Sequence, residues 1–186
     1  MTDSLVSWLL GALLLFWSLG AHNRLVRLRA GVLGQFAQVD QHMLQTLGLL
    51  ADAARVREGR GVDQDSGRSP TSRPQARDAL LAAASQFEVA LRVTRKHPLD
   101  AGLVGALRSA HVTVHDAWER HHAGRVHSSI PPDGPALQRA WEGNTEVVRE
   151  AVLAFNAAVQ AYNTAIAQFP ACMLAYLFSF KRAAQL

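Results

Sequence analysis

The segment "LQRAWEGNTEVVREAVLAFNAAVQAYNTAIAQF", residues 137–169, carries the clearest structural pattern in the chain. Its large apolar side chains recur at steps of three and four residues, which places them along one face of a helix. They are Leu137, Trp141, Val148, Val152, Phe155, Val159, Tyr162, Ile166 and Phe169, with Asn144 in the same line. A single helix cannot bury such a face, so the segment predicts packing against other helices.

Three more apolar stripes with helical spacing precede this segment. They lie in residues 25–54, in residues 76–96 before the His97-Pro98 pair, and in residues 99–117. Stretches rich in Gly, Pro and Ser predict loops at Glu58–Gln75 and Ala123–Gly134. No period of about 20–50 residues repeats, which argues against a solenoid. The prediction is an all-α fold in which four helices form an antiparallel bundle.

The composition of the 186 residues agrees with packed helices. The apolar share is 49% and the aromatic share only 7%, whereas sheets favour aromatic and β-branched residues. Cys172 is the single cysteine, so the chain forms no internal disulfide. Lys and Arg exceed Asp and Glu by 19 to 15, but the basic residues are scattered among acids. This scatter indicates a solvated helical surface, and we expect no nucleic-acid partner.

The segment Leu5–Ala21 contains no charged residue. As a helix it would be about 25 Å long, within the range of spanning helices, with Trp8 and Trp17 toward the two interfaces. We therefore predict a transmembrane anchor over residues 1–22. The alternative is a cleaved signal peptide, since Ser18–Gly20 offers small residues, but the positive start that signal peptides carry is missing.

Three arginines, Arg24, Arg27 and Arg29, follow the apolar segment with no acid before Asp40. Under the positive-inside rule they predict a single-pass protein with its N-terminus outside and its bundle in the cytoplasm. The same arginines suit anionic headgroups, which leaves a lipid-binding adaptor as an alternative function.

Several motifs resemble the LemA family. "NRLVRLR" at 23–29 and "AQVD" at 37–40 are similar to the family's entry after its membrane helix, and "HP" at 97–98 falls at a family proline position. "FNAAVQAYNTAIAQFP" at 155–170 and "LFSFK" at 177–181 are similar to its closing signature. The matching motif residues are Asn23, Arg24, Leu25, Val26, Arg27, Tyr162, Asn163, Phe169, Pro170, Phe178, Phe180 and Lys181.

The resemblance implies a bundle domain over residues 23–170, anchored in the bacterial inner membrane, with no established enzymatic activity. A magnetosome-membrane branch belongs to the same family. The chain departs from the family pattern at Leu44–Arg55, "LQTLGLLADAAR". From the resemblance we expect a non-enzymatic protein that binds or organises unidentified protein partners at the bilayer. No cofactor and no small-molecule substrate is expected.

The C-terminal segment, residues 171–186, is unusually apolar for a chain end. Pro170 should stop the preceding helix, and Met173, Leu174, Leu177 and Phe178 fall on one face of a further helical turn. We expect this segment to dock on the bundle, with the membrane interface as the alternative.

Three histidines are the best candidates for chemistry. His111, His115 and His122 share one helical face beside Trp118, and imidazoles four residues apart can share zinc or copper. The Glu that follows the first histidine in metalloprotease helices is missing, and no phosphate-binding or nucleophile motif occurs. A metal-binding sensor or enzyme therefore stays an alternative. The favoured interpretation is a partly exposed polar flank, without a catalytic, cofactor or metal site.

Overall fold

A computed structural model describes residues 2–55, 72–126, 134–169 and 171–186. Within these ranges most residues are helical and none forms a strand, so the predicted all-α fold is confirmed. The helices are α1 (Thr2–Arg55), α2 (Ser72–Lys96), α3 (Ala101–Val126), α4 (Gly134–Ala167) and α5 (Ala171–Leu177).

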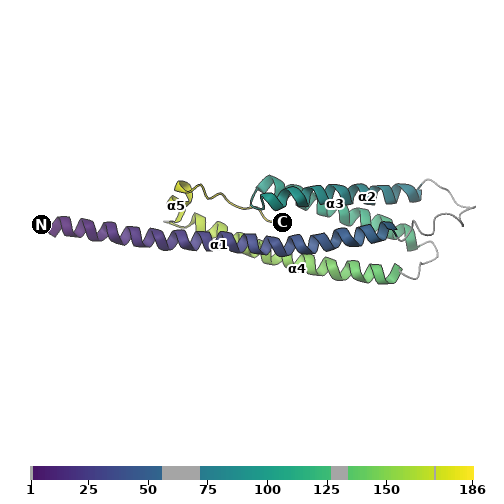
Figure 1. The fold of residues 1–186 in the computed structure, drawn as a ribbon, viewed down its shortest axis with the longest axis horizontal. Coiled ribbons are helices and arrows are strands. Elements are labelled where there is room, and N and C mark those ends of the chain that lie inside the picture. The colour runs from purple at the N-terminus through teal and green to yellow at the C-terminus, as the bar shows by residue number, and fades with distance from the viewer. Residues whose placement is uncertain (1, 56–71, 127–133, 170) are drawn as a thin grey trace, which may run out of the picture.

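The four long helices lie side by side and alternate in direction, as Figure 1 shows. They are arranged as two pairs, α1 with α4 and α2 with α3, and α1 also contacts α2. Because α1 and α4 are the longer helices, both continue past the turn that joins α2 to α3. This difference in length leaves one side of α1 and α4 without a helical neighbour at that end.

The apolar stripes predicted from the sequence supply the core. Along α4, Val148, Phe155, Val159 and Tyr162 are buried, and the Phe155 ring meets the Phe36 ring of α1 edge-on at 5.8 Å. The stripe ends earlier than predicted, because Phe169 is 81% exposed. Asn144 lies in the same seam, where its Nδ2 donates a 2.8 Å hydrogen bond to Oγ1 of the buried Thr46.

Helix boundaries differ modestly from the prediction. Helix α2 begins at Ser72, and α3 continues to Val126, so both helices take residues from the predicted loops. The rest of those predicted loops, at 58–71 and 127–133, lies outside the described residues, as does Pro170. The turn between α2 and α3 falls at the predicted His97-Pro98 pair, and the Asp100 carboxylate caps α3 by accepting the Leu103 N–H at 3.0 Å.

Helix α1 has 54 residues and projects well beyond the other helices at its N-terminal end (Figure 1). Among the α1 side chains whose placement the structure describes, the first buried one is Leu25. Among the described residues, no helix combines the length and apolar character needed to cross a membrane. The transmembrane anchor predicted over residues 1–22 therefore has no support from the structure.

We call residues 171–186 the C-terminal strap. Helix α5 contacts both α1 and α4, and the residues after it run back along the bundle toward the α2–α3 turn (Figure 1). Its most buried residues are Ala175 and Ala183, while Phe180 and Leu186 pack against the core with part of their surface exposed. The strap thus occupies the side of α1 and α4 that α2 and α3 leave uncovered.

Candidate functional site

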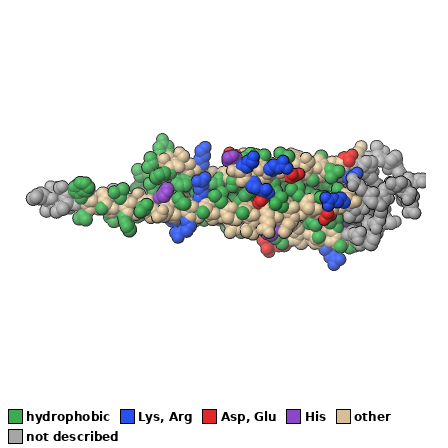
Figure 2. Space-filling model, viewed as in Figure 1, with side chains coloured by type: hydrophobic (Ala, Val, Ile, Leu, Met, Phe, Trp, Pro, Cys, Tyr) green, Lys and Arg blue, Asp and Glu red, His purple; other side chains and the backbone are tan. Residues whose placement is uncertain are grey.

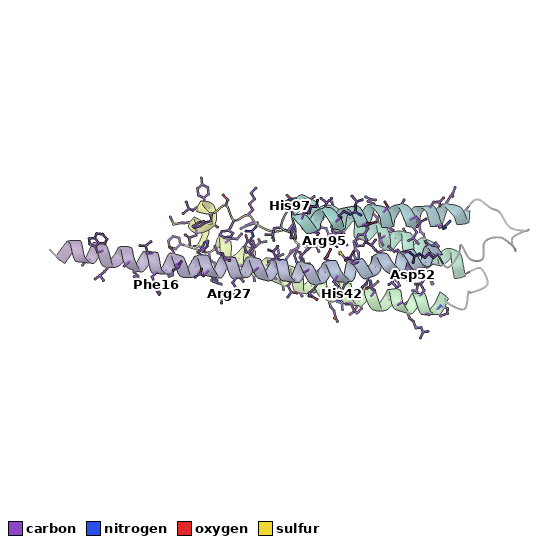
Figure 3. The ribbon with its side chains drawn as sticks, in the orientation of Figure 1. Phe16, Arg27, His42, Asp52, Arg95 and His97 are labelled. Atoms are coloured by element: carbon purple, nitrogen blue, oxygen red, sulfur yellow. The ribbon has the colours of Figure 1, made fainter. Side chains whose placement is uncertain are left out.

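The N-terminal end of α1 and the beginning of the strap carry a large group of exposed apolar side chains, which we call the apolar end. Figure 2 shows apolar side chains gathered over this region, and Phe16 is labelled there in Figure 3. The group comprises Val6, Trp8, Leu9, Leu13, Leu15, Phe16, Trp17 and Leu19 of α1, together with Phe169, Met173, Tyr176, Leu177 and Phe178. Its most exposed members are Tyr176 at 91%, and Phe16 and Phe169, each at 81%.

The exposed side chains of α1 point to opposite sides of the helix. At about 100° per residue, Trp8 and Leu15 lie roughly opposite Val6 and Leu13. A helix with one apolar stripe can be covered by one neighbouring helix, but a helix that is apolar on opposite sides needs an apolar surrounding. The N-terminal part of α1 is therefore apolar on two opposite sides, whereas the helices of the bundle carry an apolar stripe on one side.

A group of exposed basic residues follows the apolar end, and we call it the basic belt. It consists of Arg24, Arg27, Arg29, Lys181 and Arg182, from α1 and from the strap. Figure 2 shows basic side chains where the apolar projection meets the body of the molecule, and Arg27 is labelled in Figure 3. Charge therefore appears at the point where the apolar surface ends.

Aromatic contacts join the strap to α1 at this boundary. The His22 ring lies 4.7 Å from the Phe178 ring and 6.1 Å from the Phe180 ring, measured between centroids. Trp17 faces Phe169 at 6.5 Å, and both line a cavity of about 390 Å³ between α1, the end of α4 and the strap. The lining of this cavity also includes Arg24 and Leu25 of the 23–29 motif, beside Phe169 of the closing signature.

Seven of the motif residues, those on α1 and within α4, fall into three groups. Leu25 is buried in the core, while Asn23, Arg24, Val26 and Arg27 are exposed on α1. Tyr162 and Asn163 of α4 bind the strap: the Tyr162 hydroxyl donates to the Lys181 carbonyl at 3.1 Å, and Asn163 pairs with Ala183. Burial raises the pKa of Tyr162, which keeps its hydroxyl protonated as a donor.

Asn156 is a strap contact that the sequence analysis missed. Its Nδ2 donates to the Leu186 carbonyl at 2.9 Å, and its Oδ1 accepts the Leu186 N–H at 2.9 Å. The available signal was its position seven residues before Asn163, which places both amides on one side of α4. Both amides bind the same polar ligand, the backbone of the strap.

His111, His115 and His122 are partly exposed, as predicted, but their rings lie in an aromatic seam between α3 and α4. The His111 and His115 rings are 4.8 Å apart, and His115 lies 5.1 Å from Trp141 of α4. Trp118 and Trp141 stack at 4.2 Å, while His122 stacks on Trp118 at 6.5 Å. These rings fill the space between the two helix pairs.

The surroundings of these histidines favour their neutral forms. Burial, with a smaller contribution from His115, lowers the pKa of His111 from 6.5 to about 4. Burial also lowers the pKa of His115, although Glu119 and Asp116 act in the opposite direction. Neutral imidazoles can bind metal, but in the described part of the chain no three His, Cys, Asp or Glu side chains converge on a common point. The geometry therefore favours packing as the role of these rings.

Comparison with known proteins gives no relative from which a role can be transferred. No family model matches the chain, and neither a curated protein nor a solved structure is similar to it.

Proposed function

We propose that this protein is a non-enzymatic helical bundle held at the bacterial cytoplasmic membrane, where it binds or organises partner proteins. The apolar end inserts into the bilayer and the basic belt lies at the anionic headgroups. The bundle then projects into the cytoplasm. This proposal agrees with the resemblance to the LemA family, which rests on the motifs at both ends of the bundle.

The observation that carries the proposal is the apolar surface on opposite sides of α1, followed directly by the basic belt. Leaving a large apolar surface in water costs about 25 cal/mol per Å², so a surface of this size favours an apolar environment. Each arginine or lysine near an anionic bilayer adds about 1 kcal/mol of attraction. At a bilayer interface, apolar side chains lie in the hydrocarbon core and basic side chains lie next to them at the headgroups. The apolar end and the basic belt follow one another along α1 in this order.

The alternative of a metal-binding sensor or enzyme has weaker support. The histidines at its centre lie in an aromatic seam, and His111 contacts Phe87 at 5.6 Å on its other side. An active site needs a concave, accessible space next to its reactive groups. Two cavities lie at the strap and a third lies between α1 and α2, and none of the three is lined by His111, His115 or His122.

The proposal predicts that charges in the apolar end release the protein from membranes. We expect the full chain to float with vesicles containing anionic lipid, and the double variant Leu13→Arg, Phe16→Arg to stay largely in solution. An arginine at the bilayer centre costs about 2.5–3.5 kcal/mol on insertion scales, so two should reduce binding at least a hundredfold. The measurement is sucrose-gradient flotation followed by quantification of the bound fraction.

Val112→Arg is the matched control, because Val112 is an exposed valine on α3, away from the apolar end. This variant should float like the unmodified protein. Equal flotation of the double variant and the control would contradict the proposal. Protease added outside spheroplasts tests the orientation: an intact bundle is expected, and its digestion would place the bundle on the outer side.

A further inference from the structure

The last six residues of the strap are held to α4 mainly by their backbone. Asn163 donates from Nδ2 to the Ala183 carbonyl at 2.8 Å and accepts the Ala183 N–H on Oδ1 at 3.0 Å. Asn156 makes the same pair of hydrogen bonds with Leu186. Each asparagine thus binds both polar groups of one residue, as a neighbouring strand does in a sheet.

The spacing of the two asparagines fits an extended chain. Seven helical residues separate Asn156 from Asn163, a rise of about 10.5 Å at 1.5 Å per residue. Three residues separate Ala183 from Leu186, and a fully extended chain covers about 10–11 Å in three residues. The surface of α4 therefore accepts a segment only when that segment is extended.

Among the last six residues, the side chains of Ala183 and Leu186 pack against the core. Lys181, Arg182 and Gln185 are exposed, and Ala183 is the only buried residue of the six. A backbone-directed clamp accepts many sequences, provided that the residue facing Asn163 is small and is not proline. Another extended segment can thus replace the strap without loss of the asparagine contacts.

The charge of the strap is poorly matched to the surface on which it lies. A hollow of about 430 Å³ opens where the strap meets α1 and the α2–α3 turn, and its lining includes Arg29, Lys96 and Lys181. The one acid among its lining residues is Asp100, whose carboxylate already accepts the Leu103 N–H. The strap therefore brings a third cation to a site where a carboxylate would be attracted.

We propose that the α4 surface marked by Asn156 and Asn163 is a docking site for an extended acidic segment of a partner protein, which displaces the strap. The partner segment carries a carboxylate at the position of Lys181, a small residue at that of Ala183 and an apolar residue at that of Leu186. This inference rests on the proposed function as an organiser of partners, and it specifies the chemistry of the partner.

The test uses the full chain in detergent micelles and two fluorescent peptides. One peptide has the sequence of residues 179–186, and the other has the same sequence with Lys181→Asp. The protein carries Ala183→Pro, which removes the N–H that binds Asn163 and so weakens the resident strap. In fluorescence anisotropy we expect the acidic peptide to bind about tenfold more tightly than the native peptide, because it gains an ion pair where the native peptide meets repulsion.

Two further variants, each added to Ala183→Pro, separate the clamp from the charge. Asn163→Ala should reduce the binding of both peptides at least about tenfold, since it removes two hydrogen bonds. Lys96→Ala should remove most of the advantage of the acidic peptide, whereas Arg108→Ala, an exposed arginine of α3, should leave it unchanged. Equal affinity of the two peptides, or unchanged binding after Asn163→Ala, would overturn the proposal.

A second measurement needs no weakened strap. In the otherwise unmodified chain, Lys181→Glu should slow hydrogen exchange of the Ala183 and Leu186 amides severalfold, because the strap then carries the favoured charge. Unchanged or faster exchange would contradict the proposal. A concentration-dependent dimer that exchanges its straps would assign the surface to a second copy and would also overturn it. Vesicle flotation tests membrane binding, whereas peptide anisotropy and hydrogen exchange test the docking site. Failure of one proposal can therefore be told apart from failure of the other.

Discussion

Replacing Trp118 by alanine should destabilise the bundle by about 3–5 kcal/mol, the usual range for a large buried aromatic side chain. Trp118 is 2% exposed, and its ring stacks on Trp141 at 4.2 Å with 13° between the planes. The two rings come from α3 and α4 and bridge the two helix pairs. Alanine would leave a cavity at this bridge. The measurement is urea unfolding of the full chain in mild detergent, followed by circular dichroism.

Two control variants test whether the loss of unfolding free energy comes from the buried ring of Trp118. Val112→Ala, at an exposed position of the same helix, should change the free energy of unfolding by less than about 0.5 kcal/mol. Trp118→Phe should cost less than the alanine variant, because it keeps a ring and removes a buried Nε1–H that has no acceptor among the described residues. A loss below about 1 kcal/mol for Trp118→Ala would show that the seam does not join the helix pairs.

Stability should fall as the pH is lowered from 6.5 to 5. The pKa of His111 is lowered in the folded protein from 6.5 to about 4, mainly by burial. In this window the unfolded chain therefore binds a proton that the folded chain does not, and protonation favours unfolding. The contribution is present above pH 6.5 and is lost on acidification, by about 2 kcal/mol down to pH 5. His115 acts in the same direction, because its pKa is lowered too.

His111→Leu is the variant that isolates this effect. It keeps an apolar side chain against Phe87 and removes the titrating group. Urea unfolding at a series of pH values should then show a weaker pH dependence than in the unmodified protein. The same slope in both proteins would assign the acid sensitivity to other groups.

The helices of the bundle could be predicted from the sequence because each has an apolar stripe of helical period. Phe36, Phe87 and Val114 lie in the three ranges predicted to carry such stripes, Phe155 was named on the fourth stripe, and all four are buried. Periodicity says which residues share a face, but it does not say what covers that face. The histidines of α3 were accordingly placed on one face, yet the covering ring of Trp141 belongs to α4 and was not predicted.

The backbone contacts of the strap are a second feature that could not be predicted from the sequence. Its apolar spacing suggested docking on the bundle, and the structure places it against α1 and α4. The asparagine clamps depend on an extended backbone in one register, and no local pattern specifies that register. Asn163 and Lys181 were singled out through the family resemblance alone, and Tyr162 through both the resemblance and the apolar stripe. Asn156 lies within the 155–170 motif but was not singled out.

The location of the apolar end is the central claim, and spin-label accessibility tests it most directly. Cys172 is the single cysteine, so Cys172→Ser provides a background for labels at Leu13→Cys, Phe16→Cys and, as control, Val112→Cys. In vesicles with anionic lipid, we expect oxygen to reach the first two labels more readily than a water-soluble nickel complex, since oxygen partitions into hydrocarbon. The Val112 label should show the reverse order. Ready access of the nickel complex to Leu13 and Phe16 would contradict insertion of the apolar end into the bilayer.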